Sequence, residues 1–137
     1  EIITAMPEYD TAMKRYNAFG QELSNALELM QVEYNNKLDK YQQDAKTLTD
    51  IVKANREQEL TDMMNRINTF QQSAQSKMQD KQAELLNPIL EKANKAISDV
   101  AKEGGFIYIY DARSLVYFDP AKSVDITALV KTKLGIK

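Results

Sequence analysis

The feature that most constrains this chain is a long segment without glycine. Between Gly20 and Gly104 there is no glycine and only one proline, Pro88. The segment is rich in Glu, Gln, Lys, Leu, Ala and Met, which are residues of high helix propensity. Such a segment predicts long α-helix and leaves little room for any other structure.

From Tyr16 to Val100 the apolar residues form two series at the spacing of one helix face, with steps of three or four that are broken only at the polar Gln82. The first series comprises Tyr16, Phe19, Leu23, Leu27, Met30, Tyr34, Leu38, Tyr41, Ala45, Leu48 and Val52. The second series comprises Leu60, Met63, Ile67, Phe70, Ala74, Met78, Leu85, Ile89, Ala93, Ile97 and Val100. Each series forms an apolar stripe, so we expect two helices that pack through these stripes.

One uninterrupted helix is the alternative to a hairpin and would form a filament-like rod. The charges favour the hairpin, because Lys46 and Lys53 suit the end of one helix and Glu57 suits the start of the next. Asn55 lies between them and readily adopts the left-handed conformation that ends a helix. We therefore predict an antiparallel hairpin whose tip lies near residues 53–57.

The residues after the second predicted helix have the composition of a small β region. Gly104 and Gly105 are typical of a helix end. The segments 106–110 and 115–118 are rich in aromatic and β-branched residues, which predicts two short strands. Asp125 is a suitable N-cap for a final short helix.

Two strands are too few to form a stable sheet of their own. We therefore expect partner strands from other copies of the chain or from a strand that precedes Glu1. The side chains assigned to this body are Phe106, Tyr108, Tyr110, Leu115 and Tyr117. The predicted fold class is mainly α with a small β body, in which residues 1–20 and 89–137 form the body and residues 21–88 form a projecting helical arm.

The composition argues against an enzyme. The chain has no Cys and no His, so it lacks a cysteine nucleophile, a thiolate zinc site and the usual general base near neutral pH. Its four glycines form no phosphate-binding loop. We expect no catalytic residue, cofactor or metal, and interpret Glu57, Glu59 and Asp62 as a solvated helix start rather than a cation site. The net charge of −2 predicts no nucleic-acid partner and no strong binding to an anionic membrane.

Several apolar residues lie off the two stripes and are candidates for binding a partner. They are Leu29, Val32, Ile51, Met64, Leu86 and Leu90. We expect Ile51 and Met64 to be exposed. For Leu29, Leu86 and Leu90 the alternative is packing into the body.

Gly20 and Pro88 are candidates for a hinge at the base of the arm. With a tip at residue 55, Gly20 lies near Leu90 and close to Pro88. A glycine beside a proline on the facing helix predicts a bend or weak point. The alternative is two independent, tolerated irregularities.

The C-terminal third resembles the Skp/OmpH family of periplasmic chaperones for outer-membrane proteins. The resemblance rests on the helix end Ala96–Glu103, the strands Phe106–Asp111 and Leu115–Phe118, and Asp125-Ile126-Thr127 at the final helix. The start Glu1–Glu8 is similar to the segment that follows the first strand in this family. The resemblance implies a periplasmic homotrimer joined by its β body, with the first body strand preceding this chain. Its helical hairpins would enclose unfolded outer-membrane proteins without ATP.

The charge of the arm departs from that family, whose arms carry an excess of lysine and arginine. Here residues 1–53 carry six basic and nine acidic side chains, and residues 54–103 carry seven and eight. We therefore expect client holding to depend on apolar contacts and enclosure, with little sensitivity to salt. Two other functions remain alternatives: a structural coiled-coil adaptor that docks a folded partner, and a prefoldin-like holdase.

Overall fold

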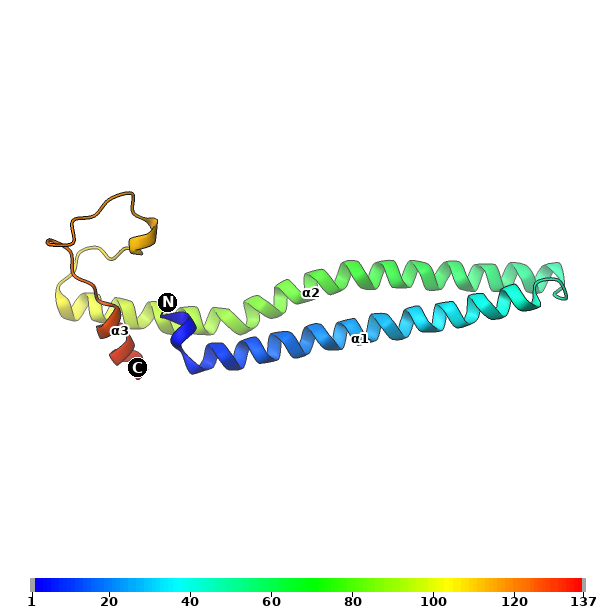
Figure 1. The fold of residues 1–137 in the computed structure, drawn as a ribbon, viewed down its shortest axis with the longest axis horizontal. Helices are drawn as coiled ribbons and strands as arrows, with labels where there is room; N and C mark the ends of the chain where they lie inside the picture. Colours follow the sequence, from blue (N-terminus) through cyan, green and yellow to red (C-terminus); the bar gives the residue numbers. More distant parts are fainter. Residues whose placement is uncertain (1, 137) are drawn as a thin grey trace. The chain divides into compact units, whose positions relative to one another are not determined.

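The computed structural model describes residues 2–136, and its two long elements are helices (Figure 1). In chain order the elements are η1 (Ile3–Ala5), α1 (Pro7–Asp44), α2 (Asp50–Gly104), η2 (Ala112–Ser114) and α3 (Thr127–Leu134), where η marks a short 3₁₀ helix. The chain divides into two units: the arm unit, Arg15–Gln82, and the body unit, Glu1–Lys14 with Ala83–Lys137. The mainly helical fold is therefore confirmed.

The start of α1 follows from its first residues. Pro7 occupies the first helical position, where the missing N–H of proline costs nothing and its fixed φ suits the helix. Glu8 and Asp10 lie in the first turn, where negative charge is stabilised by the helix dipole.

The turn between the two long helices lies at residues 45–49. The predicted tip near 53–57 is therefore wrong, because α2 already begins at Asp50. Asn55 lies inside α2, and no residue other than glycine has a positive φ in the described part of the chain. Helix propensity thus overrides the left-handed preference of a single asparagine.

Hydroxyl side chains explain where the turn forms. Thr47 donates its backbone N–H and its hydroxyl to the carbonyl oxygen of Asp44, both at 2.8 Å. The carbonyl oxygen of Thr49 accepts the N–H of Lys53 at 2.9 Å, so Thr49 stands immediately before α2, a position that favours threonine. These local bonds compete with continuation of the helix and end α1.

Within the arm unit α1 and α2 run antiparallel, as Figure 1 shows. Lys37 of α1 forms an ion pair with Glu59 of α2. Nearer the other end of the unit, the Lys81 ammonium lies 5.7 Å from the centroid of the Phe19 ring. The first pair is centred on residue 48 and the second on residue 50, so nearly the same register holds along the arm unit.

In this register Gly20 faces Met78, and a Cβ at Gly20 would lie 3.2 Å from the Met78 Cε. The placement of Gly20 beside Leu90 followed from the wrong tip position and is replaced by this contact. Gly20 belongs to the arm unit and Pro88 to the body unit. Their role as a hinge stays a prediction.

In the body unit, Pro88 lies inside α2 without ending the helix. Proline has no N–H, so α2 lacks one backbone hydrogen-bond donor at this position. Directly after it, Ile89 and Ala93 are buried in a cluster with Met6 and Ala12. Apolar packing of this kind compensates for the missing helical hydrogen bond.

A second cluster in the body unit joins α3 to the end of α2 through Ala96, Val100 and Val130. Val130 is fully buried at 0% exposure. Ile126 is the N-cap of α3, and the predicted Asp125 lies one position before it, where its carboxylate accepts the N–H of Thr127 at 2.8 Å. Burial of one apolar face anchors α3, although the helix is short.

α2 ends at the predicted glycines. Gly105 has a φ of +69°, and the N–H of Phe106 donates to the carbonyl oxygen of Ala101 at 2.9 Å. This is the Schellman arrangement that closes many helices. The predicted helix end at Gly104 is confirmed.

The strands predicted at 106–110 and 115–118 are absent from the residues the structure describes. Between these segments Asp111 accepts the backbone N–H of Arg113 at 3.0 Å, and η2 forms in place of a hairpin turn. The physical reason is the one given above, since two short strands without a further partner make no stable sheet. The β body is therefore not present in the single chain.

Candidate functional site

The arm unit has a thin apolar core. Met63 and Ile67 are its buried side chains, and both lie on the predicted stripe of α2. On α1 the facing Met30 and Tyr34 are only half-buried. Because two packed helices cover only one face of each other, much of the arm surface faces solvent.

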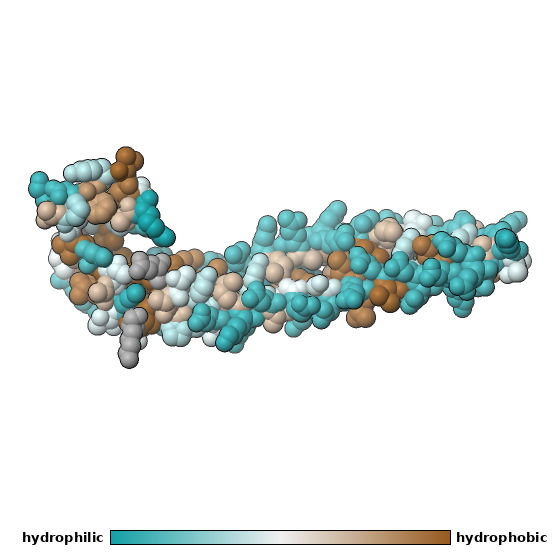
Figure 2. Space-filling view, in the orientation of Figure 1, coloured by the Kyte–Doolittle hydropathy of each residue, from teal (hydrophilic) through white to brown (hydrophobic). Residues whose placement is uncertain are grey.

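Four of the predicted binding residues lie in the arm unit and are exposed, namely Leu29, Val32, Ile51 and Met64. Leu29 is 70% exposed and Ile51 is 76% exposed. Leu29 and Val32 are three positions apart on one side of α1, so they form a small apolar patch. Figure 2 shows such apolar side chains standing among hydrophilic ones along the arm unit. Their role in binding stays a prediction.

The two remaining binding candidates lie in the body unit and differ from each other. Leu86 is half-buried and packs against the cluster that contains Met6 and Ile89. Leu90 is 38% exposed. The packing alternative therefore describes Leu86, whereas Leu90 presents part of its side chain at the surface.

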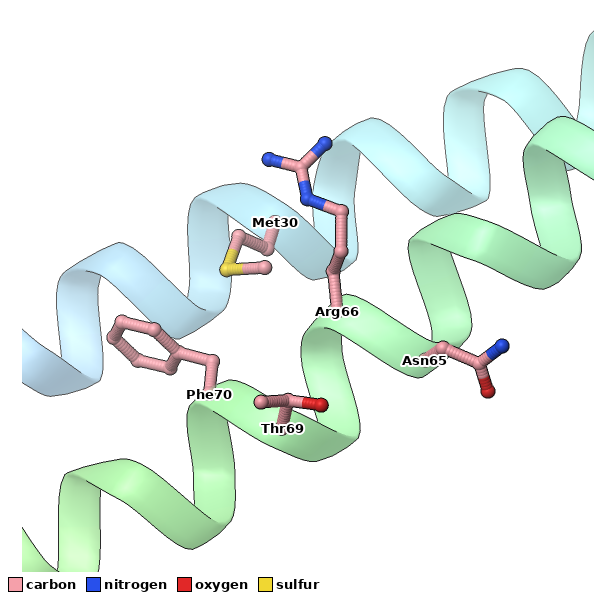
Figure 3. A pocket seen from close by; sticks show the side chains of 5 residues that line it. All are labelled: Met30, Asn65, Arg66, Thr69 and Phe70. Carbon is pink, nitrogen blue, oxygen red and sulfur yellow. The ribbon is translucent and has the colours of Figure 1, made fainter.

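The two helices of the arm unit also leave an open hollow of about 450 Å3 between them (Figure 3). Met30 of α1 lines one side, and the lining residues of α2 are Asn65, Arg66, Thr69 and Phe70. In Figure 3 the Met30 sulfur and the Phe70 ring lie near each other across the helix pair. The hollow thus combines an apolar floor with one cationic side chain.

Sequence reasoning missed this hollow. The stripes contain Met30 and Phe70 but do not say which residues of the two helices lie level with each other. That register depends on the position of the turn, which the charge pattern predicted at the wrong residues. Arg66 lies off the stripe, and nothing in its neighbourhood in the sequence distinguishes it from an ordinary surface cation.

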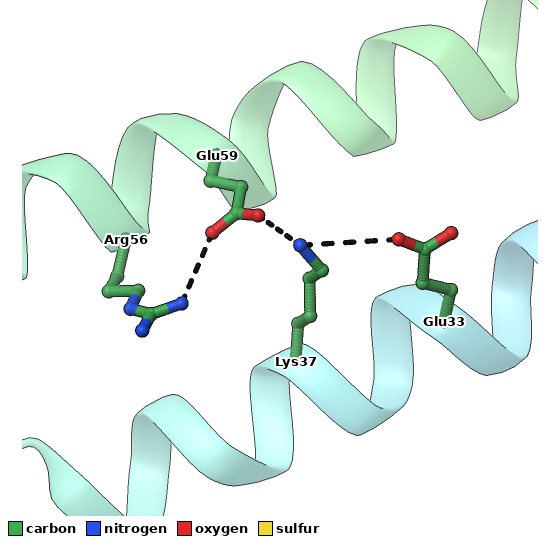
Figure 4. A network of polar contacts seen from close by, with 4 residues as sticks. All are labelled: Glu33, Lys37, Arg56 and Glu59. Atoms are coloured by element: carbon green, nitrogen blue, oxygen red, sulfur yellow. Dashed lines mark hydrogen bonds and ion pairs between the residues drawn. The ribbon is translucent and has the colours of Figure 1, made fainter.

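A network of charges links the helices closer to the turn (Figure 4). The Lys37 ammonium of α1 contacts the Glu59 carboxylate of α2 and lies 4.0 Å from Glu33. Arg56 lies 3.4 Å from the same Glu59 carboxylate. Sequence reasoning assigned Glu59 to a solvated helix start, whereas in the structure it pairs with Lys37 of the other helix.

The remaining carboxylates of the predicted acidic cluster also have protein partners. Glu57 accepts a hydrogen bond from the Tyr41 hydroxyl, which raises the pKa of that tyrosine. Asp62 accepts a hydrogen bond from the Gln58 amide at 2.8 Å. Within residues 2–136 no cluster of acidic side chains has the arrangement of a metal site. No helix in that range is long and apolar enough to cross a membrane.

The network predicts the acid response of the arm. Lys37 hydrogen-bonds to the ionised Glu59 carboxylate and so lowers the pKa of Glu59 below its ordinary value. A carboxyl whose pKa is lowered by folding stabilises the folded state above its unfolded pKa, and this contribution is lost as the pH falls through the folded pKa. We expect Lys37→Met to move the Glu59 pKa back toward its ordinary value in an NMR titration.

The matched control for this titration is Lys40→Met. Lys40 is an exposed lysine of α1, three positions from Lys37. The control removes the same charge from the same helix and should leave the pKa of Glu59 low. A Glu59 pKa that is unchanged by Lys37→Met would contradict the assignment of the shift to this ion pair.

The body unit presents a second apolar surface in the segment that follows α2. Its exposed large side chains are Ile107, Tyr108, Tyr110, Leu115, Val116, Tyr117 and Phe118. The Tyr108 and Tyr110 rings lie 6.1 Å apart, centroid to centroid. A run of this kind is unusual on a protein surface and is typical of a contact with another chain.

Comparison with known proteins gives consistent matches. A family model described as "Outer membrane protein (OmpH-like)" matches residues 1–134. "Chaperone protein Skp" of Yersinia enterocolitica is 30% identical over 136 residues, which cover 96% of this chain and 80% of that protein. Proteins of the same name from Photorhabdus laumondii subsp. laumondii and Photorhabdus luminescens are each 26% identical over 136 residues, covering 97% of this chain and 81% of those proteins. The similarity therefore spans both the arm unit and the body unit.

Proposed function

Because this chain belongs to the OmpH-like (Skp) chaperone family, we propose that it holds unfolded outer-membrane proteins and prevents their aggregation without ATP. The observation that carries the proposal is the family match over residues 1–134, which includes the arm unit and the body unit. We propose the periplasm as its compartment, on the same family grounds.

The surface of the arm unit supports this function. A holding chaperone needs many weak contacts that accept different sequences, rather than one specific pocket. Exposed apolar residues spread along two helices, such as Leu29, Ile51 and Met64, provide contacts of that kind. Unfolded chains expose the apolar side chains that match them.

The charge of the chain shapes how a client is held. The net charge is −2, and the arm carries both signs in similar numbers. Screening by salt weakens contacts between exposed charges much more than apolar contacts. Client holding by this chain should therefore persist as the salt concentration rises.

The exposed segment 106–118 supports assembly into a homotrimer through the body. Most of its aromatic side chains are exposed to solvent in the single chain. Its two strand-forming segments also need strand partners. Joining copies through this segment would complete a β body. The arms would then enclose a shared space for the client.

The proposal is tested by suppression of aggregation. Two unrelated outer-membrane β-barrel proteins are diluted from urea into buffer without ATP, and light scattering is followed with increasing amounts of this protein. Suppression of scattering for both clients near one trimer per client is the expected result. A structural adaptor would leave scattering unchanged, and that outcome would overturn the proposal.

A further inference from the structure

The hollow of the arm unit combines apolar, polar and cationic side chains in one place. It is open to solvent, and its volume of about 450 Å3 leaves room for one large side chain. Met30 and Phe70 provide apolar walls, while Asn65 and Thr69 add polar groups. An aromatic ring packs well against methionine and phenylalanine, since both make favourable contacts with ring faces and edges.

Arg66 is the cation of the hollow. It forms no ion pair with any of residues 2–136. Of the acidic side chains that precede it on α2, Glu59 binds Lys37, and Asp62, one helix turn away, accepts a hydrogen bond from the neutral amide of Gln58. The guanidinium therefore remains available to a carboxylate supplied from outside the chain.

The chemistry of arginine limits the kind of ligand that can supply this carboxylate. A guanidinium binds a carboxylate through two parallel hydrogen bonds and also lies flat against aromatic rings. In an extended polypeptide, neighbouring residues are about 3.3 Å apart and point to opposite sides. A ring seated between Met30 and Phe70 therefore leaves the residue two positions along the same chain, about 6–7 Å away, on the side that faces Arg66.

We propose that this hollow is an anchor site for an extended client segment in which a large aromatic residue and an aspartate or glutamate are separated by one residue. The inference rests on the proposed chaperone function and adds a local preference to it. The aromatic ring occupies the space lined by Met30 and Phe70. The acidic side chain pairs with Arg66.

The test uses the whole protein and short peptides that contain Phe-Ser-Asp, Phe-Ser-Asn or Ala-Ser-Asp in a Gly/Ser background, called the Phe-Asp, Phe-Asn and Ala-Asp peptides. The reporter is the ¹³C-labelled methyl group of Met30, and the methyl group of Met78, which lies beside Gly20 outside the hollow, is an internal control. We expect the Phe-Asp peptide to shift the Met30 signal at roughly two- to fivefold lower concentration than the Phe-Asn peptide, the range of an exposed ion pair. The Ala-Asp peptide should leave Met30 unshifted.

Substitutions assign the charge effect to one side chain. Arg66→Gln should bring the Phe-Asp peptide to the affinity of the Phe-Asn peptide without changing the latter. The matched control is Lys77→Gln, which removes one exposed cation from the same helix outside the hollow. It should preserve the preference.

Equal binding of the Phe-Asp and Phe-Asn peptides, or shifts at Met78 instead of Met30, would overturn the inference. Failure of the chaperone proposal is recognised separately. Arg66→Gln should still suppress client aggregation, because holding is spread over many contacts. A wild-type chain that suppresses aggregation but shows no Met30 shift would leave the chaperone standing and remove only the anchor site. A Met30 shift without suppression of aggregation would support the anchor site and overturn the chaperone proposal.

Discussion

A chain whose arm is shortened by two heptads in each helix is expected to assemble normally and to lose its protection of unfolded clients. The variant lacks residues 27–40 of α1 and 58–71 of α2, and it keeps the native turn at 45–49. Two heptads restore nearly the same helix phase, so the remaining stripes still face each other. The deletion removes Leu29, Val32, Met64 and the hollow together.

Light scattering and sedimentation equilibrium provide the two measurements. We expect a trimer of reduced mass and scattering close to that of the client alone. A full-length control has Leu29, Val32 and Met64 replaced by serine, and it separates the effect of arm length from that of apolar contacts. We expect this control to protect the client from aggregation partially. Full protection by the shortened chain would place holding in the body, and a monomeric shortened chain would place the assembly contacts in the arm.

Met6→Ala is expected to destabilise the body unit by about 2–5 kcal/mol, the usual cost of removing a buried methionine side chain. Met6 is 1% exposed and belongs to the cluster with Ala12, Ile89 and Ala93. The truncation removes packed atoms and leaves a cavity at the start of α1. Urea unfolding at a fixed protein concentration, followed by circular dichroism, measures the loss.

The matched control is Met64→Ala, which makes the same chemical change at a side chain that is 39% exposed. Its effect should stay below about 1 kcal/mol, as for most surface substitutions. Equal destabilisation by both substitutions would show that burial in the single chain does not describe the environment of Met6 in solution.

Much of the fold could be predicted because its signals are local. Long helices follow from propensity and period, and the helix end at Gly104 and Gly105 follows from the conformational freedom of glycine. The hydrogen bond that Asp125 accepts at the start of α3 is equally local. Each of these features is decided by residues a few positions apart.

The turn was misplaced because two local signals competed. Charges and Asn55 pointed to residues 53–57, whereas the bonds that Thr47 donates to Asp44, and the bond that the Thr49 carbonyl accepts from Lys53, place the turn at 45–49. Hydrogen bonds made by threonine act at the helix end itself. The helix dipole favours a charge anywhere in the last turn, and its contribution to the free energy is smaller. The register of the arm and its facing pairs depend on this choice.

The candidate site was predictable where a local pattern decides it. Exposure of Ile51 and Met64 follows from their positions off the stripe. The hollow needs the relative position of two helices, which a periodic pattern does not contain. The strands at 106–110 and 115–118 need partner strands, so their propensity alone does not form a sheet in one chain.

The thin core of the arm unit has a consequence for folding cooperativity. Residues 15–82 bury only Met63 and Ile67, whereas the body unit contains two buried clusters. Segments with few buried apolar contacts open by local unfolding at a lower free energy than the segments that contain the core. The distal turns of α1 and α2 should therefore exchange between helix and coil many times while the body stays folded. We expect an arm of this kind to adapt its surface to a bound polypeptide through brief, reversible melting, without any rigid closing movement.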